Sequence, residues 1–203
     1  MNKLIVSLLL TVGISGIAHA AGDATAGQAK AAVCGACHGP DGNSMAPNFP
    51  KLAGQGERYL NKQLHDIKSG KRTVLEMTGL LTNLSDQDLA DIAAYFSSQK
   101  GSVGAADPKV VARGEALFRG GDLTKNMPAC TGCHSPNGAG NAAAGFPHLG
   151  GQHAQYVAKQ LTDFRKEEGG RTNDGDTKIM QTIAKKMSDE EIAAVSSYIQ
   201  GLH

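Results

Sequence analysis

The chain has 203 residues, of which 20 are basic and 19 acidic, so its formal net charge is +1. Charges this balanced, with no long run of one sign, give no indication of binding to nucleic acid. Large side chains are few, since there is no Trp and only five Phe and four Tyr. Domains of ~80–90 residues are marginal on that basis unless a bound group completes their cores.

The first 20 residues have the pattern of a secretory signal. Lys3 supplies the positive start, residues 4–17 form an apolar stretch, and Ala18-His19-Ala20 has the small-x-small cleavage pattern. The apolar stretch is shorter than the ~20 residues that a membrane-spanning helix needs. We therefore expect cleavage after Ala20 and an exported, soluble mature protein without net charge.

The pentapeptide Cys-x-x-Cys-His occurs twice and uses every cysteine of the chain. The first copy contains Cys34, Cys37 and His38, and the second contains Cys130, Cys133 and His134. This is the attachment signature of a c-type haem. The two thiols form thioethers with the porphyrin, and the histidine binds the iron as the proximal axial ligand. We therefore expect two covalently bound haem c groups.

Two other readings of the cysteine pairs remain open. A Cys-x-x-Cys pair can be a redox-active disulfide or half of a tetrahedral zinc site. The histidine that follows each pair counts against both readings. So does the spacing of 96 residues between the pairs, because four-cysteine zinc sites bring their pairs within ~15–20 residues.

The chain is an internal duplication. Residues 49–55 (FPKLAGQ) recur as residues 146–152 (FPHLGGQ), and residues 84–89 (LSDQDL) match residues 187–192 (MSDEEI). The offset grows from 96 at the cysteines to 103 at the last segment, which places small insertions in loops of the second half. Because the matches run in order, the sequence predicts two tandem domains of one fold.

The domain boundaries follow from the turn-rich stretch between the halves. We expect a cleaved signal peptide (residues 1–20), an N-terminal domain (21–101), a linker (102–108) and a C-terminal domain (109–203).

Three helices are expected in each half, with long loops and no strand. The expected ranges are residues 24–33, 58–69 and 86–99 in the first half, and 108–118, 154–167 and 189–200 in the second.

Local signals mark where some of these helices begin. Ser85 and Ser188 are predicted N-caps, and Glu191 completes a capping box with Ser188. Pro108 suits the first position of its helix, with Asp107 as the cap. Loops this long indicate a fold that is wrapped around something, which a covalently attached haem would supply.

The second axial ligand decides what each iron can do. An open position permits ligand binding and turnover, whereas a methionine thioether closes the site and raises the potential. Met77 and Met180 each lie eight residues before the predicted N-cap of the last helix. A single methionine usually fills a core gap, but the equivalent placement in both halves favours iron ligation.

The remaining methionines and histidines are weaker candidates. Met187 aligns with a leucine and is expected in the core, Met45 has no counterpart, and Met127 lies too close to the second motif. His153 and His203 are expected at the surface.

Pro50 and Pro147 follow the two motif histidines by 12 and 13 residues. A backbone carbonyl there would accept the Nδ1–H of the axial histidine and set its orientation and basicity. A plain turn proline is the alternative.

The chain resembles the dihaem cytochrome c4 family over its whole mature length. The resemblance rests on the two haem motifs, the Phe-Pro-x-Leu-x-Gly-Gln segments, both methionine loops and residues 192–202 (IAAVSSYIQGL). It implies an all-α fold of two tandem class I cytochrome c domains, each wrapped around one covalently bound haem, with the propionate edges facing across the interface. It also implies close crossings of the first and last helices at Gly27 and Gly114.

The resemblance further implies a function. The chain is expected to be a monomeric periplasmic electron carrier and not an enzyme. It would take electrons from a quinol-oxidising complex or other donor and pass them toward a terminal oxidase, with peripheral contact with the inner membrane. The expected iron ligands are His38, Met77, His134 and Met180. Two alternatives are the cytochrome subunit of a flavocytochrome of the sulfide dehydrogenase type and a dihaem peroxidase.

Overall fold

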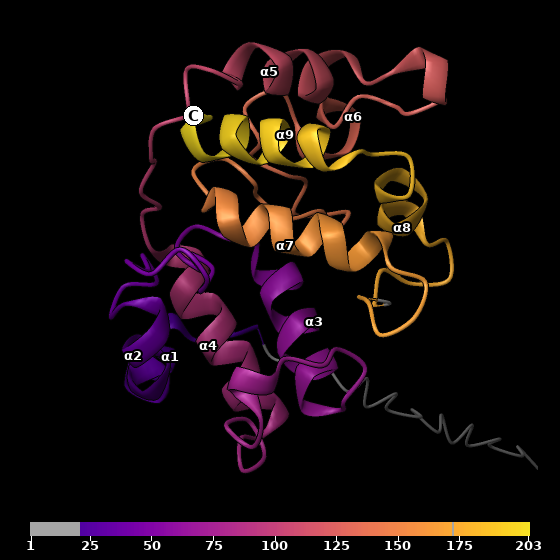
Figure 1. The fold of residues 1–203 in the computed structure, drawn as a ribbon. Helices are drawn as coiled ribbons and strands as arrows, with labels where there is room; N and C mark the ends of the chain where they lie inside the picture. The colour runs from indigo at the N-terminus through magenta and orange to yellow at the C-terminus, as the bar shows by residue number, and fades with distance from the viewer. Residues whose placement is uncertain (1–20, 172) are drawn as a thin grey trace, which may run out of the picture.

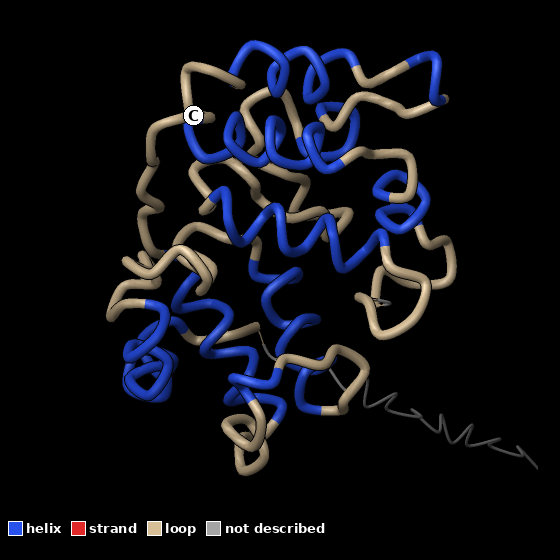
Figure 2. The backbone as a smooth tube through the Cα atoms, viewed as in Figure 1, coloured by secondary structure: helices blue, strands red, loops and turns tan. Residues whose placement is uncertain are grey.

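The computed structural model describes residues 21–171 and 173–203, so the predicted signal peptide lies outside the described residues. Regular structure in these two ranges is helical, and the β-contacts there are isolated bridges, Asp122 with Met127 and Asn141 with Phe146 (Figure 2). None of the helices described is long and apolar enough to span a bilayer. The all-α prediction is confirmed.

The two halves repeat one order of helices. The first half contains α1 (Ala24–Lys30), η1 (Ala31–Cys34), α2 (Gly35–His38), α3 (Glu57–Lys68), η2 (Leu75–Met77) and α4 (Asp86–Ser98). The second contains α5 (Val111–Gly120), η3 (Leu123–Lys125), α6 (Thr131–His134), α7 (Ala154–Arg165), α8 (Ile179–Ala184) and α9 (Asp189–Gly201). Figure 1 shows the halves stacked, with α7 on the side of the second half that faces α3.

Both last helices begin at the predicted serines. Ser85 accepts a hydrogen bond at its Oγ from the backbone N–H of Asp88 (3.1 Å), and Ser188 accepts one from that of Glu191 (3.3 Å). The Asp88 and Glu191 carboxylates accept from the serine N–H groups in return, at 2.8 and 2.9 Å. Each last helix therefore has a capping box, although only the second was predicted.

The helix after the linker begins later than predicted. α5 begins at Val111, and a turn precedes it in place of the expected start at Pro108. Asp107 accepts from the N–H of Lys109 (2.9 Å), and its carbonyl accepts from that of Val111 (3.0 Å). The N–H of Asp107 donates to Ser197 Oγ on α9 (2.8 Å). This tie to the last helix holds the segment in a turn, so Asp107 closes the turn and does not cap the helix.

The predicted apolar stripes of the last helices are buried. Leu89, Ile92, Ala93 and Phe96 on α4 and Ile192, Val195, Ser196 and Ile199 on α9 are at most 3 % exposed. The core of the first half is small, consisting of Ala31, Leu60, Ile92, Ala93 and Phe96. A core of this size fits a domain that a bound group completes.

The first and last helices of each half cross at a glycine, as the resemblance implied. A Cβ on Gly27 would lie 2.0 Å from the carbonyl oxygen of Asp91 on α4. A Cβ on Gly114 would lie 2.1 Å from that of Ala194 on α9. Only glycine lets the two backbones approach this closely.

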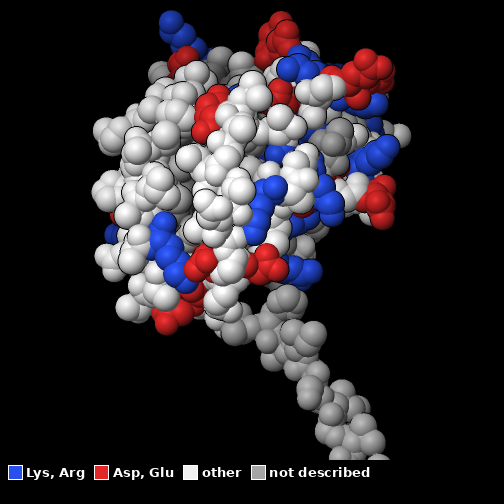
Figure 3. Space-filling view, turned by 90° about the horizontal axis from the view of Figure 1, so that it is seen from below, with Lys and Arg blue, Asp and Glu red and all other residues white. Residues whose placement is uncertain are grey.

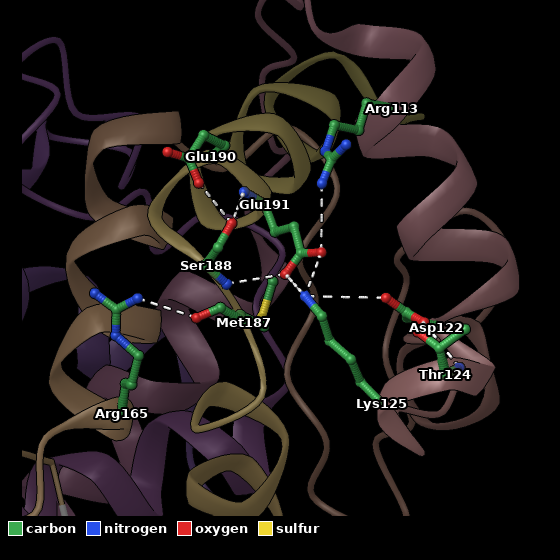
Figure 4. A network of polar contacts seen from close by, with 9 residues as sticks. All are labelled: Arg113, Asp122, Thr124, Lys125, Arg165, Met187, Ser188, Glu190 and Glu191. Atoms are coloured by element: carbon green, nitrogen blue, oxygen red, sulfur yellow. Dashed lines mark hydrogen bonds and ion pairs between the residues drawn. The ribbon is translucent and has the colours of Figure 1, made fainter.

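A buried carboxylate connects the loop before the second haem motif to the start of α9. Glu191 accepts from Lys125 Nζ at both oxygens (2.7 Å each), and Arg113 lies 3.4 Å away (Figure 4). In the first half, Lys30 reaches Asp88 and Asp91 at 2.6 Å in the same way. In each half, therefore, a lysine that lies just before the haem motif forms an ion pair with the last helix.

Candidate haem sites

The haem motifs lie on single helical turns. Cys34 is the N-cap of α2 and Cys37 lies three residues later, so both thiols point to the same side of the turn. His38 ends that helix and is buried. Cys130, Cys133 and His134 repeat this arrangement on α6. The local geometry suits two thioether bonds and one histidine directed at the same ring.

Each motif histidine is held by a proline carbonyl. His38 Nδ1 lies 2.9 Å from the carbonyl oxygen of Pro50, and His134 Nδ1 lies 3.0 Å from that of Pro147. A carbonyl only accepts, so Nδ1 carries the proton and Nε2 is left with a free lone pair. The prediction for the two prolines is confirmed, and each imidazole presents the nitrogen that iron binds.

The surroundings keep these histidines neutral and oriented. Burial lowers the pKa of His38 and of His134, and the hydrogen bond to proline opposes that shift without reversing it. Phe49 packs against His38 and Phe146 against His134, with ring centroids 6.2 Å apart in both pairs. A neutral imidazole in a fixed orientation is a ready metal ligand.

None of the four cysteines takes part in a disulfide. Cys34 and Cys130 pack against the hydrophobic cores of their halves. Burial raises the pKa of the Cys34 thiol and raises that of Cys130 to about 11. A redox-active Cys-x-x-Cys pair requires the opposite shift, toward a stable thiolate. The environment therefore argues against the redox-disulfide reading.

The zinc reading lacks a ligand set. Within residues 21–171 and 173–203, no group of three or more His, Cys, Asp or Glu side chains is placed to hold a metal ion. A structural zinc site needs four such ligands. Haem attachment accounts for each cysteine pair and its histidine within one turn.

The two methionines lie in matching loops but in different local structure. Met77 ends the short turn η2 and is partly buried, whereas Met180 lies in α8 and packs against the core of the second half. A hollow of ≈ 270 Å³ lies beside Met77, lined also by Ile67, Val74 and Leu81. Its lining also includes Lys68, Arg72 and three threonines (Thr73, Thr78 and Thr82), so the hollow has both apolar and polar walls. Iron coordination by Met77 and Met180 stays a prediction.

Two repeated arginines meet between the halves, which sequence reasoning did not single out. Arg72 donates to Tyr156 (3.0 Å) and Arg171 to Tyr59 (3.0 Å). Both arginines also donate to Gln63, each at 2.9 Å. Neutral acceptors thus surround two cations at the interface, and such a place suits the anionic edge of a haem. The repeated Arg-Thr pair was the sequence signal for it.

His153 is not the simple surface residue that was expected. Its Nε2 lies 2.9 Å from the carbonyl oxygen of Ser44 and 3.0 Å from the Ser44 hydroxyl, across the contact between the halves. His148 lies in the same contact, with its Nδ1 3.2 Å from the carbonyl oxygen of Gly54. Each half of the chain read alone offers no signal for such contacts.

Comparison with known proteins agrees with the two-domain site. The cytochrome c family model matches residues 24–100 and again residues 111–203. A cytochrome c4 of Pseudomonas aeruginosa is 82% identical over 203 residues, which is the full length of both chains. A thiosulfate dehydrogenase electron acceptor of Stutzerimonas stutzeri is 39% identical over 176 residues, covering 83% of this chain and 78% of that protein.

A solved structure extends the agreement to three dimensions. Reduced recombinant cytochrome c4 from Pseudomonas stutzeri superposes with a TM-score of 0.88 at 71% identity, covering 90% of this chain and 100% of the other. The repeated helices, the paired histidine–proline contacts and the two Cys-x-x-Cys-His turns are what such a protein requires. The chain belongs to the cytochrome c4 family of dihaem electron carriers and holds two covalently bound haem c groups.

Proposed function

We propose that the chain is a periplasmic carrier in a respiratory chain, taking electrons from a quinol-oxidising complex or a similar donor and passing them toward a terminal oxidase. His38 and Met77 would ligate the iron of the first half, and His134 and Met180 that of the second. The observation that carries this proposal is the equivalence of the two sites. Both histidines are tied to proline in the same way, and both methionine loops precede a capped last helix.

The contribution of the protein is to keep the haems and their axial ligands in fixed positions. The four cysteines would hold the two rings through thioethers, and the carbonyls of Pro50 and Pro147 orient the imidazoles of His38 and His134. The haem supplies one-electron oxidation and reduction when bound. A site whose ligands do not change between the two oxidation states needs little rearrangement for each transfer.

A peroxidase would require one site to differ from the other. One iron would have to lose its methionine or present an open position to hydrogen peroxide. Both halves instead have the same histidine contact and a methionine at the matching position. The carrier reading is therefore favoured, and peroxide turnover by the half-reduced protein would contradict it.

Absorption spectroscopy of methionine variants tests the ligation. Met77→Ala and Met180→Ala should each remove the long-wavelength methionine–iron band of one haem and leave that of the other. Met45→Ala is the matched control, because Met45 is 93 % exposed and belongs to neither loop. Wild-type spectra in both loop variants would show the assignment to be wrong.

Respiratory function has its own test. The reduced protein, added to inner-membrane vesicles that contain the terminal oxidase, should be oxidised with uptake of oxygen, and cyanide should block the reaction. The protein should appear in the periplasmic fraction, shortened by residues 1–20. A protein that stays reduced in this assay would not be a donor to the oxidase.

A second candidate is a carrier for a sulfur-oxidising enzyme. Relatives at 39% and 36% identity are thiosulfate dehydrogenase electron acceptors, of Stutzerimonas stutzeri and Thiomonas intermedia. A sulfide dehydrogenase of the flavocytochrome type would use the same haem architecture with a fixed flavin-containing partner. Co-purification with a flavoprotein subunit, or rapid reduction by thiosulfate dehydrogenase and thiosulfate, would favour this role over the oxidase route.

A further inference from the structure

A buried glutamine ends each repeated Phe-Pro-x-Leu-x-Gly-Gln segment, and both glutamines reach into the opposite half. Gln152 Oε1 accepts from the backbone N–H of Lys51 at 2.9 Å, and its Nε2 donates to the carbonyl of Lys51 at 2.9 Å. Gln55 pairs with His148 in the same way, at 2.7 and 2.9 Å. The glutamines are 7–8 % exposed. In each half, therefore, one glutamine side chain makes two hydrogen bonds with the backbone of a single residue in the other half.

Gln152 bonds to the same peptide group that accepts the hydrogen bond of the axial histidine, and we call such a group the proximal peptide. The carbonyl of Pro50 and the N–H of Lys51 belong to the same peptide group. That carbonyl accepts from His38 at 2.9 Å, while the N–H donates to Gln152 at 2.9 Å. One planar, conjugated amide therefore connects the proximal histidine of the first half to a side chain of the second.

The second half repeats the arrangement with the roles of the halves exchanged. The carbonyl of Pro147 accepts from His134 at 3.0 Å, and the N–H of His148, in the same peptide group, donates to Gln55 at 2.7 Å. The two chains of hydrogen bonds are related by the internal duplication. Neither could form in an isolated half.

Hydrogen bonds in such a chain strengthen one another. When the N–H of an amide donates, electron density moves toward its oxygen, so the carbonyl becomes a better acceptor. A better acceptor draws the Nδ1 proton of the histidine more strongly and makes the imidazole a stronger donor to the iron. A stronger donor stabilises the ferric state, which lowers the reduction potential.

The glutamines are themselves held in place. Gln152 Oε1 also accepts from the N–H of His153, and Gln55 Oε1 from that of Gly56, each at 3.0 Å. Every polar atom of both side chains is therefore occupied, and each carboxamide has one orientation. A fixed carboxamide transmits a change at the interface to the histidine on the other side.

We propose that Gln152 is a positioning residue for the N-terminal haem and Gln55 one for the C-terminal haem, each tuning the axial histidine of the opposite half through one peptide group. The proposal rests on the proposed ligation by His38 and His134. It makes the reduction potential of each haem depend on contact between the halves. A partner that shifts one half against the other would then change both potentials.

The test uses the full haem-loaded protein and the variants Gln152→Met and Gln55→Met, which keep side-chain length and remove the amide. In the reduced protein, Gln152→Met should shift the Nδ1–H proton resonance of His38 and leave that of His134 in place. It should also raise the N-terminal haem potential, with a change in the electron-binding constant of up to about twofold, as expected when loss of one hydrogen bond weakens the next by roughly 10–30 %. Gln55→Met should shift the Nδ1–H resonance of His134, leave that of His38 in place, and raise the potential of the C-terminal haem.

Arg58→Met provides the control for a general loosening of the interface. Arg58 donates to the carbonyl of Ala143 across the contact between the halves. It makes no hydrogen bond to the Pro50–Lys51 or the Pro147–His148 peptide group. The Arg58→Met variant should leave the Nδ1–H resonances of His38 and His134 and the potentials of both haems unchanged. If each glutamine variant alters the haem of its own half, or if all three variants act alike, or if none has an effect, the proposal is overturned.

Failure of the ligation itself is recognised separately. The wild-type reduced protein must first show ring-current-shifted resonances from two bound histidines and two bound methionines. If those of His38 and His134 are missing, the proposed function fails before any glutamine is changed. If they are present and the variants leave them unmoved, only the glutamine coupling fails.

Discussion

Arg171 in the C-terminal half donates a hydrogen bond of 3.0 Å from Nη2 to the hydroxyl of Tyr59 in the N-terminal half. Its repeat equivalent, Arg72, makes the reciprocal bond to Tyr156 at the same distance. Charges of both signs are interspersed on the face of the described residues in Figure 3, but at this internal contact two guanidinium groups share mainly neutral acceptors. The contact therefore affects the titration of Tyr59.

The Tyr59 hydroxyl should titrate at an unusually low pH. Burial raises the pKa of this phenol, but the charges of Arg171 and Arg72 and the hydrogen bond from Arg171 outweigh burial and hold the pKa below its ordinary value. Arg171→Met should raise the pKa of Tyr59, as followed by NMR of protein labelled with ¹³C at the tyrosine Cζ. Tyr95→Phe, whose hydroxyl bonds only to Pro40, should leave that titration as it is. An unchanged Tyr59 titration in Arg171→Met would contradict the assignment.

Haem content should follow the cysteine pairs independently. Replacing Cys130 and Cys133 with alanine removes both thioethers of the second half, so the haem count should fall from two to one by mass spectrometry. The matched variant lacks Cys34 and Cys37 and should also retain one haem. If either double variant keeps two covalent haems, the pairing of one motif with one haem is incorrect.

The close helix crossings should not accept a methyl group. In Gly114→Ala the new Cβ meets the carbonyl oxygen of Ala194 at 2.1 Å, so α5 and α9 must move apart. We expect a loss of about 1–3 kcal/mol in the free energy of unfolding, measured by urea denaturation of the haem-loaded protein. Gly120→Ala in the same helix has nothing within 4 Å of the new Cβ and should be neutral or slightly stabilising. Equal effects of the two substitutions would argue against a tight crossing.

The buried Glu191 should stabilise the second half in a pH-dependent way. Its hydrogen bond from Lys125 is the largest cause that holds the pKa of the carboxyl below 4.5. A lowered pKa contributes stability above the unfolded value of 4.5 that is lost as the pH falls through the folded value. Near neutral pH, Glu191→Gln should therefore unfold more easily by about 1.5–3 kcal/mol, the range for hydrogen bonds to charged groups.

The same comparison repeated below pH 4.5 is the decisive part of this test. The difference between wild type and Glu191→Gln should shrink as the pH falls through the lowered folded pKa, because the wild-type carboxyl is then neutral in both the folded and the unfolded state. Glu115→Gln is the control, since the ion pair of Glu115 with Arg119 is exposed and contributes little. A difference between wild type and Glu191→Gln that is constant with pH would mean that the charge is not what stabilises α9.

Helices were predictable where their signals are local. The last helices begin at Ser85 and Ser188 because a serine followed three residues later by an acid satisfies the free N–H groups of the first turn. Pro108 shows the limit of such signals, because its helical geometry was overridden by the bond from Asp107 to Ser197, a residue 90 positions away. Tertiary contacts decide between two conformations that local preference leaves nearly equal.

The sequence by itself determined the haem chemistry and the duplication, because Cys-x-x-Cys-His places thiols and imidazole on one turn and because repeated segments recur in order. It also indicated the proline carbonyls behind both histidines. Only the tertiary structure decided that a glutamine of the other half bonds to each proximal peptide. It also decided that Arg72 and Arg171 lie together at the contact between the halves. The bonds between Lys51 and Gln152 join residues 101 positions apart. Neither residue carries a local or periodic signal of that pairing, since it exists only when the two folded halves are in contact.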